Sequence, residues 1–152
     1  MNPSDLVAPP HGLPGATLRR VIEHIDANCH RGPRLSELSA LAHMSTFHFA
    51  RLFKRSTGQS PHRFVIGRRI DHAKAMLAAG RLTIAAISRE VGFRTPSHFT
   101  TVFRRAAGTT PSVYRAKTHE ASLAHEALSK TDASSGSGIE SDTQPTPASK
   151  TA

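Results

Sequence analysis

Residues 84–115 have the sequence IAAISREVGFRTPSHFTTVFRRAAGTTPSVYR, and the same pattern occurs earlier in residues 35–61, LSELSALAHMSTFHFARLFKRSTGQSP. The first part repeats at an offset of 49 residues, where Leu35, Leu38, Ala42 and Met44 match Ile84, Ile87, Val91 and Phe93. The next part repeats at an offset of 50, where Ser45, Phe49, Phe53, Lys54, Arg55, Gly58, Pro61 and Phe64 match Thr95, Phe99, Phe103, Arg104, Arg105, Gly108, Pro111 and Tyr114. Arg94 is therefore an extra residue at the turn of the second copy. Apolar, capping and helix-stop residues repeat together, which indicates two helix-turn-helix units.

The segments around the two copies also have helical patterns. Thr17 is expected to cap a first helix whose inner face is Leu18, Val21, Ile22 and Ile25. Ser60-Pro61 begins a longer helix with an inner stripe of Ile66, Ile70, Ala73 and Leu77, and Gly80 ends it. No segment alternates apolar and polar residues with the period of a strand. The predicted fold class is all-α, with about seven helices arranged as two helix-turn-helix subdomains joined by a long linker helix.

Composition divides the chain into three parts. Residues 1–16 are rich in Pro and Gly and are expected to be a flexible leader. A domain is expected over 17–117, with its first unit at about 17–60, the linker helix at about 61–79 and the second unit at about 81–116. The last helix is expected to be short and to pass through Tyr114. Residues 118–152 have few large apolar side chains, so we expect a disordered tail in which only a short frayed helix precedes Ser129.

The charge distribution favours a polyanionic partner. Residues 18–117 contain 18 Lys and Arg but 5 Asp and Glu, a net charge of +13, whereas the rest of the chain has a net charge of −4. A basic block of this kind is typical of nucleic-acid binding and, less often, of a merely solvated basic surface. The chain has no apolar run of about 18 residues and no signal-peptide pattern, so no membrane insertion is expected. The single cysteine, Cys29, fits a reducing cytoplasm.

From about Leu18 to Lys117 the chain resembles the DNA-binding domain of the AraC/XylS family of bacterial transcription regulators. The resemblance rests on both quoted segments, and above all on V-G-F, S-H-F, F-R-R and Y-R in the second. It implies that two recognition helices enter successive segments of the major groove, about one helical turn of DNA apart, and that the linker helix sets their separation.

The resemblance and the helical periodicity together give candidate DNA contacts on the first recognition helix. Phe49, Leu52 and Phe53 are expected to face the core, which leaves Thr46, Phe47, Ala50, Arg51 and Lys54 on the opposite face. We expect Phe47, Ala50 and Arg51 to touch bases, because Arg binds guanine with two hydrogen bonds and an apolar side chain fits a thymine methyl group. Phe47 could alternatively be a core aromatic, and Arg51 could bind phosphate. Residues expected to contact the DNA backbone in this unit are Ser45, Thr46, His48, Lys54 and Arg55.

The second recognition helix has shorter side chains on its equivalent face. Its expected base contacts are Pro96, Ser97, Thr100 and Thr101, and its expected backbone contacts are Thr95, His98, Arg104 and Arg105. Relatives have long amide or Arg side chains there, so we expect the first unit to do most of the sequence recognition and the second to bind phosphates and sense DNA shape. Arg34 is a milder departure from the family pattern, because a small hydroxyl residue is expected at that helix start, as Thr83 provides in the second copy.

Other constellations are weak. The ten histidines do not have the spacing of a zinc site, and no catalytic motif or phosphate loop is present, so we expect no metal, no cofactor and no enzyme activity. The interpretation is a sequence-specific regulator of double-stranded promoter DNA, an activator that contacts RNA polymerase and binds DNA as a monomer, located at the bacterial nucleoid. It resembles the family's stand-alone members. The alternatives are a sequence-neutral architectural DNA binder, a protein-binding adaptor, and the DNA-binding remnant of a longer regulator with a sensor domain.

Overall fold

The computed structural model describes residues 12–132. The chain divides into two compact parts, and the first, which ends at His119, contains both helix-turn-helix units, while the second begins at Glu120. The described residues form seven α-helices and one short 3-10 helix, and they contain no strand. The elements are α1 (Gly15–Asn28), η2 (Cys29–Arg31), α2 (Leu35–Leu41), α3 (Thr46–Thr57), α4 (Pro61–Ala79), α5 (Ile84–Glu90), α6 (Pro96–Ala107) and α7 (Pro111–Asp132). The predicted all-α class is confirmed.

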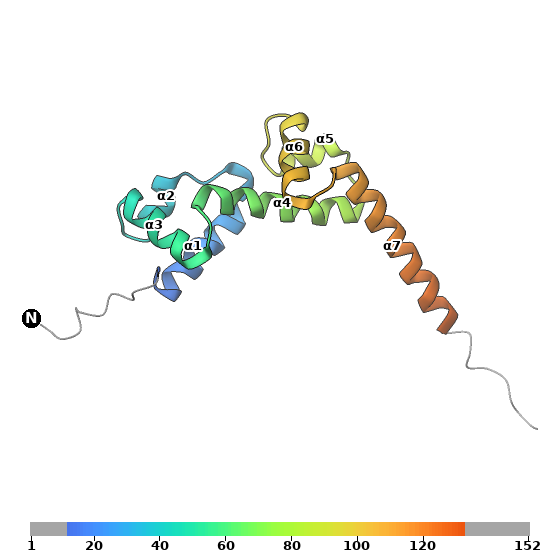
Figure 1. The fold of residues 1–152 in the computed structure, drawn as a ribbon, viewed down its shortest axis with the longest axis horizontal. Helices are drawn as coiled ribbons and strands as arrows, with labels where there is room; N and C mark the ends of the chain where they lie inside the picture. Colours follow the sequence, from blue (N-terminus) through green and yellow to red (C-terminus); the bar gives the residue numbers. More distant parts are fainter. Residues whose placement is uncertain (1–11, 133–152) are drawn as a thin grey trace, which may run out of the picture. The chain divides into compact units, whose positions relative to one another are not determined.

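The linker helix α4 contributes to two separate hydrophobic cores. Its first part packs with α1, η2 and α3, and its second part packs with α5 and α6 (Figure 1). Val65 belongs to the first core, whereas Ile70, Ala73 and Leu77 belong to the second. The predicted inner stripe of α4 is correct for its second half. It omits Val65, because a helix that serves two cores turns a different face to each of them.

Each core is built around a pair of phenylalanines from its recognition helix. Phe49 and Phe53 are fully buried in the first core, with ring centroids 5.5 Å apart, and Phe99 and Phe103 are fully buried in the second, 5.6 Å apart. Full burial of a Phe side chain contributes about 1.5–3 kcal/mol each to the free energy of folding. The repeated aromatic spacing in the sequence is therefore a repeated core.

The turns of the two units differ as the sequence alignment predicts. In the first turn His43 has a positive φ of 53°, and in the second Gly92 has a φ of 87° at the matching position. The amide groups of Met44 and Phe93 donate to the carbonyl oxygens of Ser39 and Ser88 at 3.0 and 2.9 Å. The extra residue, Arg94, follows Phe93 and precedes the cap of α6. The two turns thus share the same backbone hydrogen bond, and the inserted residue follows the second turn.

The beginning of the domain corrects the sequence prediction. Helix α1 begins at Gly15 with Pro14 at its N-cap, rather than after Thr17. Leu13 is only 7% exposed and joins the first core, and its amide donates to Ser56 Oγ at 2.8 Å. The part of the expected leader that the structure describes is therefore folded. The apolar pattern of α1 begins only at Leu18, so one isolated leucine among Pro and Gly gave no periodic signal. The rest of the expected leader, 1–11, lies outside the described residues.

The last helix is also longer than predicted. We expected a short helix through Tyr114 and a disordered tail over 118–152 with only a short frayed helix before Ser129, but α7 continues without a break to Asp132. Residues 118–130 include three Ala, two Glu and two Leu, which have high helix propensity, and Lys130 pairs with Glu126 at 3.2 Å one turn away. Every residue from 119 to 130 is exposed, so local propensity rather than packing forms this part of α7. The remaining tail, 133–152, lies outside the described residues.

Candidate nucleic-acid interface

The first recognition helix, α3, is oriented by its cap and its buried face. Ser45 accepts a hydrogen bond from the amide of His48 at 3.3 Å, so the helix begins where the sequence predicted. With Phe49 and Phe53 buried, the opposite face points to solvent. Phe47 is 79% exposed, which confirms its predicted exposure and excludes the core alternative. An exposed phenylalanine beside a basic residue is suited to contact with the apolar edge of a base.

The second recognition helix, α6, repeats this construction. Thr95 accepts from the amide of His98 at 3.2 Å, and Pro96 occupies the first helical turn. The His98 ring packs edge-on against Phe93 with centroids 5.4 Å apart. Thr101 Oγ1 donates to the carbonyl oxygen of Ser97 at 3.1 Å, so its hydroxyl hydrogen is already used within the helix. That bond leaves Thr101 as an acceptor, which further limits the polar reach of this face.

The predicted contact residues all lie at the surface. Ala50 and Thr100 are half-buried, and the others are exposed, namely Ser45, Thr46, Phe47, His48, Arg51, Lys54, Arg55, Thr95, Pro96, Ser97, His98, Thr101, Arg104 and Arg105. Neither α3 nor α6 has an acidic residue in its first turn. The N-terminal amides of both helices can therefore attract phosphate without competition from a neighbouring carboxylate.

The start of α2 differs from the start of its counterpart α5. Arg34 occupies the N-cap of α2 and its side chain makes no capping hydrogen bond. Thr83 occupies the N-cap of α5 and accepts from the amide of Ala86 at 3.1 Å. The loss of a cap costs about 1 kcal/mol. The structure thus bears out the departure at Arg34 that the repeat indicates.

A junction that sequence reasoning missed connects the two units beside α4. Arg69 Nε donates to the carbonyl oxygen of Cys29 at 2.6 Å, and its guanidinium lies 5.6 Å from the centre of the Phe93 ring. A Cβ added at Gly92 would lie 2.0 Å from the carbonyl oxygen of His30, so the turn before α6 approaches η2 very closely. Burial lowers the pKa of Arg69 from its ordinary value, although the guanidinium stays charged.

The distance between the two recognition helices therefore depends on this junction as well as on the length of α4. The only sequence signal was a glycine at the turn, and a glycine there is also explained by the positive φ alone. Gly92 lies against the backbone carbonyl of His30, and any residue at position 30 would provide that group, so the contact leaves no pattern in the sequence.

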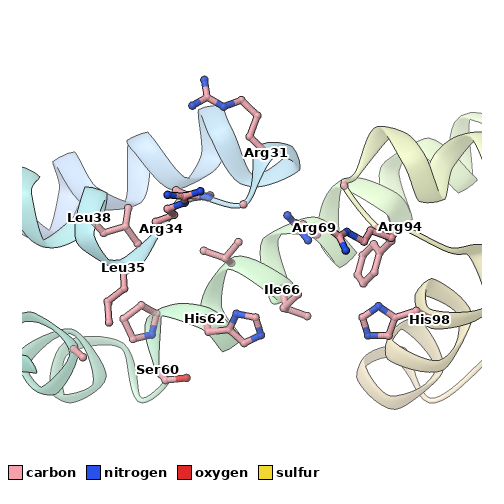
Figure 2. Close-up of a pocket in the computed structure, with 17 residues that line it drawn as sticks. Arg31, Arg34, Leu35, Leu38, Ser60, His62, Ile66, Arg69, Arg94 and His98 are labelled. Carbon is pink, nitrogen blue, oxygen red and sulfur yellow. The ribbon is translucent and has the colours of Figure 1, made fainter. Parts of the chain in front are cut away.

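A cavity of about 770 Å³ lies between the two units, over α4. Ala50 of α3 and His98 of α6 both border it, so the two recognition helices face a common space. Figure 2 shows Arg34 on the α2 side and Arg94 on the α6 side, with His62 and Ile66 of α4 between them. Four arginines and no carboxylate line the cavity. It is a strongly cationic recess within the candidate interface.

The histidines and the cysteine form other contacts. His24 Nε2 bonds Glu37 Oε1 at 2.6 Å, and this hydrogen bond holds the pKa of Glu37 below its ordinary value. Cys29 is buried, its sulfur lies 3.7 Å from His72 Nδ1, and burial raises the pKa of the thiol. Within residues 12–132 no group of three or more His, Cys, Asp or Glu could hold a metal ion. None of the helices in that range is both long and apolar enough to cross a membrane.

Comparisons with known proteins agree with this architecture. A family model described as a helix-turn-helix domain matches residues 38–117. The crystal structure of a probable AraC family transcriptional regulator from Rhodopseudomonas palustris is 31% identical and has a TM-score of 0.61, with 68% of this chain and 98% of that chain covered. The chain belongs to the AraC/XylS family. The DNA-binding domain of AdpA, solved in complex with a target DNA, is 30% identical with a TM-score of 0.62, covering 66% of this chain and 91% of that domain.

Full-length AraC-family relatives are longer than the matched region. The regulatory protein PocR of Salmonella typhimurium is 30% identical over 103 residues, which is 68% of this chain and 34% of PocR. The virulence regulon transcriptional activator VirF of Yersinia enterocolitica is 34% identical over 96 residues, which is 63% of this chain and 35% of VirF. The chain therefore spans about a third of the length of these curated relatives. Both relatives are named as regulators and not as enzymes.

Proposed function

We propose that this AraC-family chain is a sequence-specific regulator of transcription that binds double-stranded DNA with α3 and α6 in successive major-groove segments. The observation that carries the proposal is the presentation of two recognition helices of equal length, equally capped, with exposed faces that border one cationic recess. AdpA, which has the same fold and 30% identity, was crystallised with DNA. We propose that the DNA-binding domain spans about 17–117, with Leu13 before it packed in the first core.

The two helices would contribute differently to recognition. Phe47, Ala50 and Arg51 of α3 would contact bases, with Arg51 as the main hydrogen-bond donor to guanine. Ser97 and Thr100 of α6 reach only a short distance, so this helix would act mainly through phosphate contacts and water. A sequence-neutral binder is the second candidate, and it is favoured by the short side chains of α6 but not by those of α3.

The regulatory context follows from the relatives as a proposal. VirF is named an activator, and we extend activation, through contact with RNA polymerase, to this chain. We also propose that the domain binds DNA as a monomer, because its two units already supply two recognition helices. It would act on chromosomal DNA in the bacterial cytoplasm, and we propose no cofactor.

An insertion in α4 tests whether the two units act on one DNA site as a rigid pair. The buried residues of the two cores divide on α4 after Val65 and before Ile70, so one alanine inserted after Gly67 keeps both buried sets in register and displaces only the partly buried Ile66 from the second core. It rotates the second unit by about 100° relative to the first, because an α-helix has 3.6 residues per turn. Specific affinity, measured by fluorescence anisotropy with random DNA as competitor, should collapse while circular dichroism stays helical.

The control is one alanine inserted after Glu120, where α7 is exposed and lies outside the compact part that contains both helix-turn-helix units. Its specific affinity should equal that of the unaltered chain. Full specific affinity of the α4 insertion would contradict the proposed two-helix mode of binding. An unaltered chain that binds random DNA as tightly as its selected site would favour the architectural alternative.

A further inference from the structure

Two arginines depart from the internal repeat, and the fold brings them to the same place. Arg34 replaces the hydroxyl residue that caps the equivalent helix, and Arg94 is the residue inserted after the turn of the second copy. The two positions are 60 residues apart in the sequence. Both line the cavity between the two units, Arg34 on the α2 side and Arg94 on the α6 side (Figure 2). Two independent departures that converge on one recess suggest a common ligand.

The fold itself uses neither guanidinium. Arg34 and Arg94 are exposed, and neither side chain forms a hydrogen bond or an ion pair with any of residues 12–132. Two arginines of α4, by contrast, have protein partners: Arg69 binds the carbonyl oxygen of Cys29, and Arg68 forms an ion pair with Asp26. An arginine without a protein partner keeps all five of its N–H donors available for an anion. Arg34 therefore lowers the stability of the α2 N-terminus, and no other contact of its side chain within the described residues compensates for the missing cap.

The position of the recess between the two recognition helices indicates that the anion is a DNA phosphate. Ala50 of α3 and His98 of α6 border it, and both are proposed DNA contacts. When two recognition helices occupy successive major-groove segments, the sugar-phosphate strands between those segments must pass across the space between the helices. His62 adds an exposed imidazole from α4, and no carboxylate repels a phosphate there.

We propose that Arg34 and Arg94 bind phosphates of the DNA backbone that runs between the two major-groove segments, Arg34 from the α2 side of the recess and Arg94 from the α6 side. This inference rests on the proposed function, since it assumes that α3 and α6 both enter the major groove. The contacts would be independent of base identity, so they would fix the register of the domain on DNA without adding sequence preference.

The test compares the double variant Arg34→Ala/Arg94→Ala with Arg19→Ala/Arg20→Ala. The control pair removes the same charge from exposed positions of α1 that do not line the recess. Affinity for a selected duplex is measured by fluorescence anisotropy at several salt concentrations, and circular dichroism checks the fold. Two lost phosphate contacts should reduce the slope of log affinity against log salt by about 1.8, and affinity at 0.1 M salt should fall about 10- to 100-fold. The control should change the slope by much less.

Phosphate ethylation interference locates the contacts. Ethylation of phosphates between the two protected major-groove segments should block binding of the unaltered chain and should no longer matter for Arg34→Ala/Arg94→Ala. Equal slopes in the two double variants, or interference that persists at those phosphates, would overturn the inference. A changed preference at a single base pair would also overturn it, because the arginines would then contact bases. If the unaltered chain shows no preference for its selected site, the proposed function has failed instead.

Discussion

Replacing Gly92 by alanine should loosen the junction between the two units without altering a core residue or a proposed DNA contact. Gly92 has a φ of 87°, and a Cβ there would lie 2.0 Å from the carbonyl oxygen of His30 and 2.8 Å from its carbonyl carbon. His43 adopts a φ of 53° at the matching turn of the first unit. The conformation alone therefore does not require glycine, and the close approach to η2 does.

The cost can be separated into two parts with a matched control. Gly108 has a φ of 72° and open space around its Cβ position, so Gly108→Ala adds backbone strain alone, about 1–2 kcal/mol. Gly92→Ala adds the same strain and must also displace the backbone of His30, which is comparable to overpacking a core at about 1–3 kcal/mol. The free energy of unfolding should thus fall by about 2–5 kcal/mol for Gly92→Ala. The difference between the two losses in free energy of unfolding measures the cost of displacing His30 at the junction.

Urea unfolding followed by far-ultraviolet circular dichroism gives the two free energies, and fluorescence anisotropy gives DNA affinity under conditions where both variants are folded. Gly92→Ala should bind a two-part DNA site more weakly than Gly108→Ala does, because the displaced carbonyls also weaken the hydrogen bonds of Arg69 that hold the units together. Equal losses of stability and affinity in the two variants would refute the idea that the junction controls the spacing.

Three further predictions concern recognition, pH and the end of the chain. Arg51→Ala should weaken specific binding by about 1–3 kcal/mol and relax preference at one guanine, whereas Thr100→Ala should change preference less; a uniform loss on all sequences would make Arg51 a phosphate contact. The hydrogen bond from His24 lowers the pKa of Glu37, so it stabilises the fold above pH 4.5 and is lost as the pH falls through the lowered pKa. Glu37→Gln should therefore flatten the pH dependence of urea unfolding below pH 4.5, and an unchanged profile would contradict this. Removal of the acidic segment 118–152 should leave DNA affinity unchanged or slightly higher in anisotropy titrations at two salt concentrations, and a tenfold loss would show that this segment contributes to binding.

The internal repeat made most of the fold predictable. Caps such as Ser45 and Thr95, and buried pairs such as Phe49 and Phe53, are local signals that a helix period reveals directly. The exposure of Phe47 followed from the same geometry, because two faces of one helix cannot both be buried against a single core.

Features that depend on tertiary contacts were not predictable in this way. Leu13 is one apolar residue without periodic neighbours, and it packs in the first core while its amide bonds Ser56, 43 residues away. The junction at Arg69 is made with backbone carbonyls, which leave no pattern in the sequence. The length of α7 was missed for a different reason, since a disordered tail was inferred from the lack of large apolar residues although helix propensity suffices where no core is needed.

The recess is the clearest case of partial prediction. The sequence indicated Arg34 and Arg94 as departures from the repeat, but their convergence depends on how α4 places one unit beside the other. Sequence comparison of the two copies therefore found the residues, and only the fold brought them together.

Selection of bound duplexes from a random DNA pool, with the unaltered chain, tests the central claim most directly. Two recognition helices on one linker helix predict a two-part motif whose halves are centred about one turn of DNA apart, roughly 10 base pairs, with the stronger preference in the half that α3 contacts. A single uninterrupted motif, or no enriched sequence at all, would contradict the account.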